Sequence, residues 1–247
     1  MPSVSNNFFL LDLEQVSLTT EKLTQRIQDR FPDSGLGKVC RELANISRRT
    51  RKTSLWLRRP LYSLRAISWT VSIALLGGSI WSLWLFGKGI DQMGLAEFIQ
   101  VSEAAINDVV LIGAAIYFLH TIEKRIKRSR ALVSIHELRS VAHIIDMHQL
   151  TKDPERLDQV KYIQTESSPQ PTMNPFMLRR YLDYCSEMLS LTAKIAAIYA
   201  QDLEDSTVLS AVTEVEGMTS DLSRKIWQKI MLIHEIEVRQ PGKGNSH

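Results

Sequence analysis

The sequence predicts an all-α protein in which a two-span transmembrane helical hairpin carries long cytoplasmic helices and a C-terminal antiparallel helical hairpin. Residues 66–86 contain no charged side chain and, at about 1.5 Å per residue, are long enough to cross a hydrocarbon core of roughly 30 Å. A second apolar run follows at residues 109–122. Outside these runs the apolar residues recur at helical spacing, and we find no segment with the alternation typical of a strand.

These patterns divide the chain into six parts. Overall composition adds little, since 44% of the residues are hydrophobic and the formal net charge is only +3. The predicted parts are N-terminal cytoplasmic helices with a basic juxtamembrane segment (1–64), the transmembrane hairpin (65–122), a cytoplasmic extension of the second span (123–150), a linker (151–174), the C-terminal helical hairpin (175–238) and a disordered tail (239–247).

Two helices are expected before the membrane. The first covers residues 19–31 and is stopped by the turn that begins at Pro32. The second begins near Leu36 and runs into an arginine-rich stretch. Pro60 should break this helix just before the first span, because proline removes a backbone donor and clashes with the preceding turn.

The distribution of charge predicts the orientation of the spans. Lysines and arginines are dense before the first span and after the second, whereas acids dominate the turn between them. Because basic residues that flank a span stay in the cytoplasm, we expect both termini there, in what is most simply a bacterial inner membrane. Trp69 near one end of the first span and Trp81 and Trp84 near the other fit the two headgroup regions.

The second span is predicted to be part of one long helix. Its apolar core is short, so a full crossing must begin near Ala104 and include Asn107 and Asp108. No proline interrupts the chain from Gly94 to Leu150. A single helix of that length would be on the order of 80 Å long.

The C-terminal part is expected to form two further helices after a proline-containing linker. Asn174 and Pro175 are typical of a helix start, with proline in the first turn. Asp205 opens a capping turn before the last helix. Cys40 and Cys185 are both expected on the cytoplasmic side, as reduced and packed thiols.

Polar residues at the start of the second span are the first candidate site. Ionisable side chains at membrane depth are costly and often mark ion pathways, and carboxylates repeated around an oligomer would favour cations. Alternatively, the acids complement the dipole at a helix start. The residues predicted to line a pore or its mouth are Glu97, Glu103, Asn107 and Asp108.

A polar stripe on the cytoplasmic extension is the second candidate. His136, Arg139, His143 and Asp146 share one face at 100° per residue. In a conducting protein this stripe would couple the cytoplasmic helices to the pore. Histidine and aspartate could also bind a metal, but the two histidines lie two helical turns apart. The alternative is an ordinary polar face.

Two further sets of residues are predicted to contact another helix within the membrane or the lipid headgroups. Small residues allow helices to approach closely in lipid, and basic residues beside a span suit anionic headgroups better than nucleic acid. The predicted packing residues are Ser68, Ser72, Ser79, Ser82, Gly77 and Gly78, and the predicted headgroup contacts are Arg58, Arg59, Arg65, Lys124, Arg125, Lys127 and Arg128.

From these features we expect an oligomeric two-span inner-membrane protein that forms a pore or ion-conducting conduit gated by its cytoplasmic helices. The alternative is a non-conducting membrane-anchored scaffold that recruits a cytoplasmic partner through the C-terminal helical hairpin. We expect no enzyme activity and no cofactor, a metal-dependent activity at His136, His143 and Asp146 being the lesser alternative. The expected partners are membrane lipids, further copies of the chain and a cytoplasmic protein, but no nucleic acid.

Overall fold

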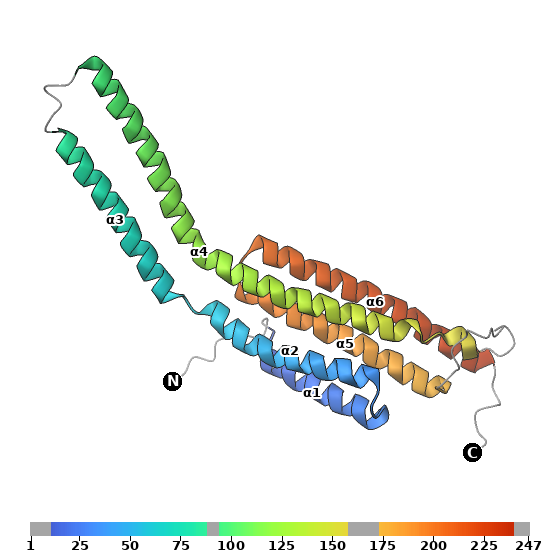
Figure 1. Ribbon diagram of the computed structural model, residues 1–247. Helices are drawn as coiled ribbons and strands as arrows, with labels where there is room; N and C mark the ends of the chain where they lie inside the picture. The colour runs from blue at the N-terminus through green and yellow to red at the C-terminus, as the bar shows by residue number, and fades with distance from the viewer. Residues whose placement is uncertain (1–10, 88–93, 158–172, 240–247) are drawn as a thin grey trace, which may run out of the picture. The chain divides into compact units, whose positions relative to one another are not determined.

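The structure, a computed structural model, describes residues 11–87, 94–157 and 173–239 (Figure 1). The described residues contain helices and no strand, which confirms the predicted all-α class. The elements are α1 (Leu13–Arg30), α2 (Gly35–Arg58), α3 (Tyr62–Gly87), α4 (Leu95–Leu150), the short 3-10 helix η2 (Pro154–Leu157), α5 (Pro175–Asp202) and α6 (Ser206–Arg239).

Local sequence signals explain most of the helix ends. α2 ends at Arg58, just before Pro60, and α4 is one helix over the whole proline-free stretch, as predicted. Asn174 caps α5, its side chain accepting a hydrogen bond from the Met177 amide at 2.8 Å. Asp205 caps α6 in the same way. The predicted tail at 239–247 falls almost wholly outside the described residues.

The first helix begins earlier than expected. α1 starts at Leu13 rather than near residue 19, because the Asp12 carboxylate accepts a hydrogen bond from the Glu14 amide at 2.8 Å. Val16 on the first turn is buried, so the apolar face continues through a segment that is mostly polar in sequence. The single cap and the single apolar residue were too weak a pattern to predict this turn.

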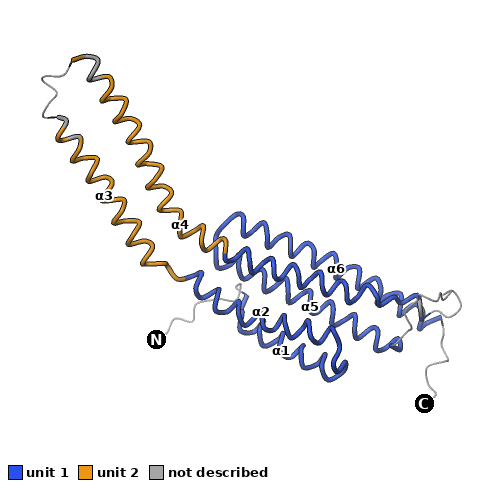
Figure 2. Tube along the Cα trace, viewed as in Figure 1, with its two compact units in different colours: residues 1–58, 130–247 blue, residues 59–129 orange. Residues whose placement is uncertain are grey.

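The chain folds as two compact units (Figure 2). Residues 1–58 and 130–247 form unit 1, and residues 59–129 form unit 2. Helix α4 contributes its C-terminal part to unit 1 and its N-terminal part to unit 2. Unit 1 therefore joins helices from three of the predicted parts: the N-terminal helices, the extension of the second span and the C-terminal helices.

Helix α5 is the centre of unit 1. Its buried residues occupy somewhat more than half of the helix circumference, a face too wide for one partner helix to cover. Helices α1, α2 and α6 pack on this face, and Ser134 of α4 lies beside its Tyr199. The α5 residues that are buried are Leu178, Tyr181, Leu182, Tyr184, Cys185, Met188, Leu189, Leu191, Thr192, Ile195, Ala196, Ile198 and Tyr199.

The surrounding helices bury residues at alternating spacings of three and four. On α4 these are Ala131, Ile135, Leu138, Ala142 and Ile145. Such spacing is typical of helices that interlock side chains along a nearly parallel seam. Arg179 near the start of α5 pairs with Glu237 near the end of α6 at 3.4 Å, so these two helices run in opposite directions.

Unit 2 contains the two segments that are long and apolar enough to cross a membrane. None of the residues in the most apolar stretch of α4 is buried, and few are buried in the corresponding stretch that includes α3. The large aliphatic and aromatic side chains of both helices are instead exposed, as Ile80 and Val109 illustrate. This is the reverse of a soluble core helix, whose apolar face is covered by the protein.

The burial of α5 predicts where unit 1 is most sensitive to substitution. Replacing the fully buried Met188 with alanine should lower the free energy of unfolding by about 2–5 kcal/mol, because a cavity is left at the centre of the unit. Met231, half exposed on α6, is the matched control and should cost far less. Unfolding of the full-length protein in detergent micelles measures both, and equal losses would contradict the central position of α5.

Candidate functional site

The polar residues predicted to line a pore are exposed side chains of α4. Glu103, Asn107 and Asp108 are all exposed in unit 2, at the start of its apolar stretch. Glu97 also belongs to α4, but its side chain lies outside the described residues. The structure thus gathers three of the four candidates on one segment of one helix, without a pocket around them.

Contacts between α3 and α4 fix the register of the two helices. Nε of Arg65 lies 2.6 Å from a carboxylate oxygen of Glu123, and the Ser68 hydroxyl donates to the carbonyl of Leu119 at 3.2 Å. On α3, Trp81 lies 16 residues after Arg65, and on α4, Asn107 lies 16 residues before Glu123. Since both helices rise about 1.5 Å per residue, Asn107 is about level with Trp81.

The small residues of α3 divide into those that contact α4 and those that do not. Ser68 and Ser72 are buried, and Ser68 bonds to α4 as described above. Ser79 donates to the Leu75 carbonyl of its own helix at 2.8 Å, and Ser82 is exposed. A Cβ atom added at Gly77 or Gly78 would meet nothing within 4 Å, so neither glycine is required for a close helix approach within the chain.

Glu123 is the centre of an ionic junction at the end of the spans. Besides Arg65, its carboxylate accepts a hydrogen bond from the Leu61 amide at 3.3 Å and lies 2.9 Å from Nζ of Lys127. The hydrogen bond from Arg65, with those from Lys127 and Leu61, lowers the pKa of the Glu123 carboxyl to about 2. Two of the predicted headgroup residues, Arg65 and Lys127, are therefore paired with one acid that the sequence pattern did not single out.

The polar stripe of α4 is partly absorbed into unit 1. Arg139 forms an ion pair with Glu214 of α6, and Asp146 accepts a hydrogen bond from Nε2 of Gln149 at 2.7 Å. His136 and His143 are exposed. Among the described residues, no group of three or more histidine, cysteine and acidic side chains is arranged to hold a metal ion.

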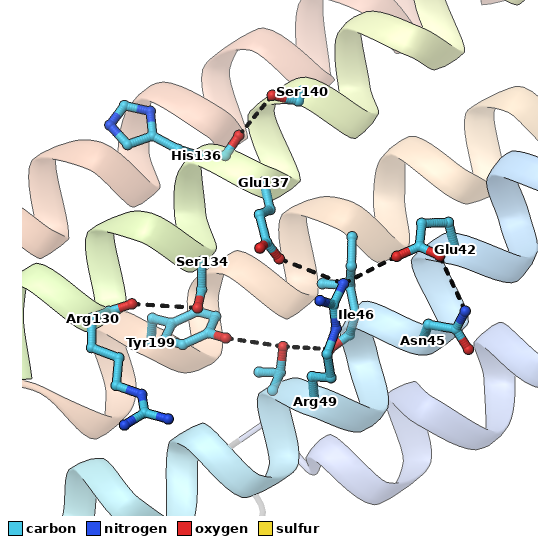
Figure 3. Close-up of polar contacts among 11 residues, drawn as sticks. Glu42, Asn45, Ile46, Arg49, Arg130, Ser134, His136, Glu137, Ser140 and Tyr199 are labelled. Carbon is cyan, nitrogen blue, oxygen red and sulfur yellow. Dashed lines mark hydrogen bonds and ion pairs between the residues drawn. The ribbon is translucent and has the colours of Figure 1, made fainter.

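A polar network with a buried centre at Tyr199 and Thr50 joins α2, α4 and α5 (Figure 3). The Tyr199 hydroxyl on α5 donates to Thr50 Oγ1 at 3.0 Å, and Thr50 donates to the Ile46 carbonyl at 2.8 Å. Ser134 of α4 lies beside the same tyrosine, and burial raises the Tyr199 pKa. Arg49 of α2 lies 3.6 Å from the Glu137 carboxylate of α4. The network holds three helices in register and contains no accessible reactive group.

The end of α4 is capped by a lysine from α6. Nζ of Lys229 donates to the carbonyls of Gln149 and Lys152 at 2.8 and 3.2 Å, and so adds a cation where the last carbonyls of a helix lack intrahelical partners. Burial lowers the pKa of this lysine. Lys229 is therefore a structural cation.

Both cysteines are buried in unit 1. The Sγ atom of Cys40 lies 3.3 Å from the Thr24 hydroxyl, and Cys185 is on the central helix. Burial raises the pKa of the Cys40 thiol to about 11 and that of Cys185 to about 12. Protonated, buried thiols are poor nucleophiles.

A groove of about 790 Å³ lies between α1 and α6. Helix α5 forms its floor through polar and charged side chains, whereas the walls include apolar residues and a half-exposed tryptophan. An ion pair of 2.9 Å between Arg26 and Glu187 crosses from α1 to the floor. The lining includes Val16 of α1, Arg180, Asp183 and Lys194 of α5, and Trp227 and Ile230 of α6.

The Tyr199 network predicts a specific coupling energy. Tyr199→Phe and Thr50→Val should each lower the free energy of unfolding by about 1–2 kcal/mol, because each leaves a buried hydroxyl without its partner. The double variant should cost less than the two losses added together, by about 1 kcal/mol. Thr213→Val, at an exposed hydroxyl of α6, is the control. Strict additivity in unfolding of the full-length protein would contradict the hydrogen bond.

Comparison of the chain with protein-family models, with curated proteins and with solved structures finds no match.

Proposed function

We propose that the chain is a membrane-anchored scaffold whose five-helix unit binds an amphipathic helix of a cytoplasmic partner protein. The observation that carries this proposal is the groove between α1 and α6, which leaves one side of the central helix open. In this proposal α3 and α4 cross the inner membrane as a hairpin, and both chain termini lie in the cytoplasm. The anchor and the binding unit share one uninterrupted helix, α4.

The exposed apolar surface of unit 2 supports the anchor. Burying such side chains in lipid removes them from water at roughly 25 cal/mol per Å², whereas leaving two whole helices exposed would promote aggregation. The excess of lysine and arginine at the Arg65 and Glu123 ends of the spans supports the orientation. Exposed Trp69 lies at that end of α3, and exposed Trp81 and Trp84 at the other.

The lining of the groove supports a helical partner. Two helices flanking a third provide a channel into which a further helix can pack by the same side-chain spacing as the neighbours. Trp227 and Val16 offer apolar contacts on the walls, and Asp183 and Lys194 offer charged contacts on the floor. A partner helix with an apolar face flanked by charges of both signs would satisfy this lining. In contrast to the expectation from sequence, the binding surface includes α1 as well as the C-terminal helices.

An ion-conducting oligomer is the second candidate. It is favoured by the exposure of Glu103, Asn107 and Asp108, since polar side chains on a span are usually covered by another subunit or by water. The register of the helices weakens it, because Asn107 is level with Trp81 in the predicted headgroup region. From Val109 to Phe118, α4 carries no charged side chain. The acids therefore suit an outer rim better than a continuous polar path.

Site-specific photo-cross-linking in cells tests the scaffold. A photoreactive residue at Trp227 should form an adduct with one partner protein, within a segment that can form an amphipathic helix. The same residue at Val133, exposed on α4 of the same unit, is the control and should not capture that protein. Equal capture at both positions, or none at Trp227, would contradict groove binding.

Reconstitution into liposomes separates the two candidates. We expect no ion flux above that of protein-free liposomes, and no change on replacing Asn107 and Asp108 with alanine, because the middle of α4 offers no polar path. Protein orientation and content in each preparation are verified by protease protection. Flux that depends on Asp108 would establish the conduit and reject a purely anchoring role for the spans.

A further inference from the structure

Three basic side chains at one end of unit 2 are without an ion-pair partner among the described residues. Arg59 and Lys124 form no ion pair with any residue that the structure describes, and both are exposed. Arg125 is also exposed and lies over the Phe118 ring at 5.2 Å from its centroid. In contrast, Arg58 is paired with Asp202 at 2.6 Å, and Arg65 and Lys127 with Glu123.

The Glu123 junction brings together the two backbone segments that carry the three residues. Arg59 lies two residues before Leu61, whose amide bonds to Glu123, and Lys124 and Arg125 follow Glu123 directly. The carboxylate of Glu123 is already occupied by Arg65, Lys127 and Leu61. It therefore holds the local backbone together without neutralising the three outward-facing cations.

The surroundings of these cations fit the boundary between acyl chains and headgroups. Phe118, half exposed in the apolar stretch, lies under the Arg125 guanidinium, so this side chain reaches back along α4 to the end of the apolar stretch. Tyr62 and Trp69 are exposed at the same end of α3. Amphipathic aromatic residues prefer this depth of the bilayer.

We propose that Arg59, Lys124 and Arg125 bind the phosphodiester group of an anionic phospholipid in the cytoplasmic leaflet. Arginine donates paired hydrogen bonds to phosphate, and lysine adds a point charge. Each basic residue near an anionic leaflet contributes about a fivefold gain in binding. This proposal goes beyond the scaffold function but rests on the proposed membrane insertion.

Native mass spectrometry of the full-length protein in detergent tests the site, with phosphatidylglycerol and phosphatidylcholine as the probes. We expect at least a tenfold preference for phosphatidylglycerol. The variant with Arg59→Gln, Lys124→Gln and Arg125→Gln should lose at least tenfold in phosphatidylglycerol binding. The matched control carries Lys22→Gln, Lys38→Gln and Lys225→Gln, which remove the same charge from exposed positions of unit 1 and should leave binding unchanged.

A further variant should strengthen the binding of phosphatidylglycerol instead of weakening it. Glu123→Gln releases Arg65 and Lys127 and should raise the affinity for phosphatidylglycerol severalfold, with thermal unfolding in phosphatidylcholine as the check on folding. Equal losses in the triple variant and its control would overturn the proposal. Displacement of the lipid by glycerol 3-phosphate at equal concentration would also overturn it, because the site would then bind a small free anion. Release of the protein from membranes by alkaline carbonate would instead reject the anchor itself.

Discussion

The wide buried face of α5 is the constraint on which unit 1 depends. Helices α1 and α2 pack on each other and also on this face, and α6 packs along it, so α5 links the N-terminal helices to the C-terminal one. Several polar groups that enter this core have partners within it, as the Tyr199–Thr50 bond and the Lys229 cap on α4 show. Such partners matter because an unpaired polar group costs far more in an apolar interior than at a surface. The one side of α5 without a covering helix is the groove, and its floor is accordingly charged.

In unit 2, small side chains and polar contacts hold the two helices together, in place of an apolar core. Its two helices share few buried side chains, and those of α3 are the small hydroxyls of Ser68 and Ser72. The polar contact that fixes their register is the Glu123 junction at one end, where an acid is surrounded by two cations and an amide. This is the arrangement expected where the apolar environment supplies no driving force between helices and packing must come from small residues and polar bonds.

The sequence predicted the helices well because their signals are local. Charge-free length marked the spans, Pro60 marked the end of α2, and Asn174 and Asp205 marked two helix starts. The early start of α1 was missed because its first turn has only Val16 on the apolar face. The grouping of helices into unit 1 could not be predicted, since the wide apolar face of α5 does not specify which helices cover it. The groove and the Glu123 junction depend on contacts between residues far apart in the chain, for which periodicity carries no information.

The central position of α5 has a consequence for the order in which the chain can fold. Helices α1 and α2 are synthesised before α5 and can pack on each other, yet the part of their apolar surface that contacts α5 has no partner until α5 emerges. That part of the N-terminal core therefore stays uncovered while α3 and α4 are synthesised. Chain synthesis thus imposes a delay between formation of the first helix pair and completion of the core of unit 1.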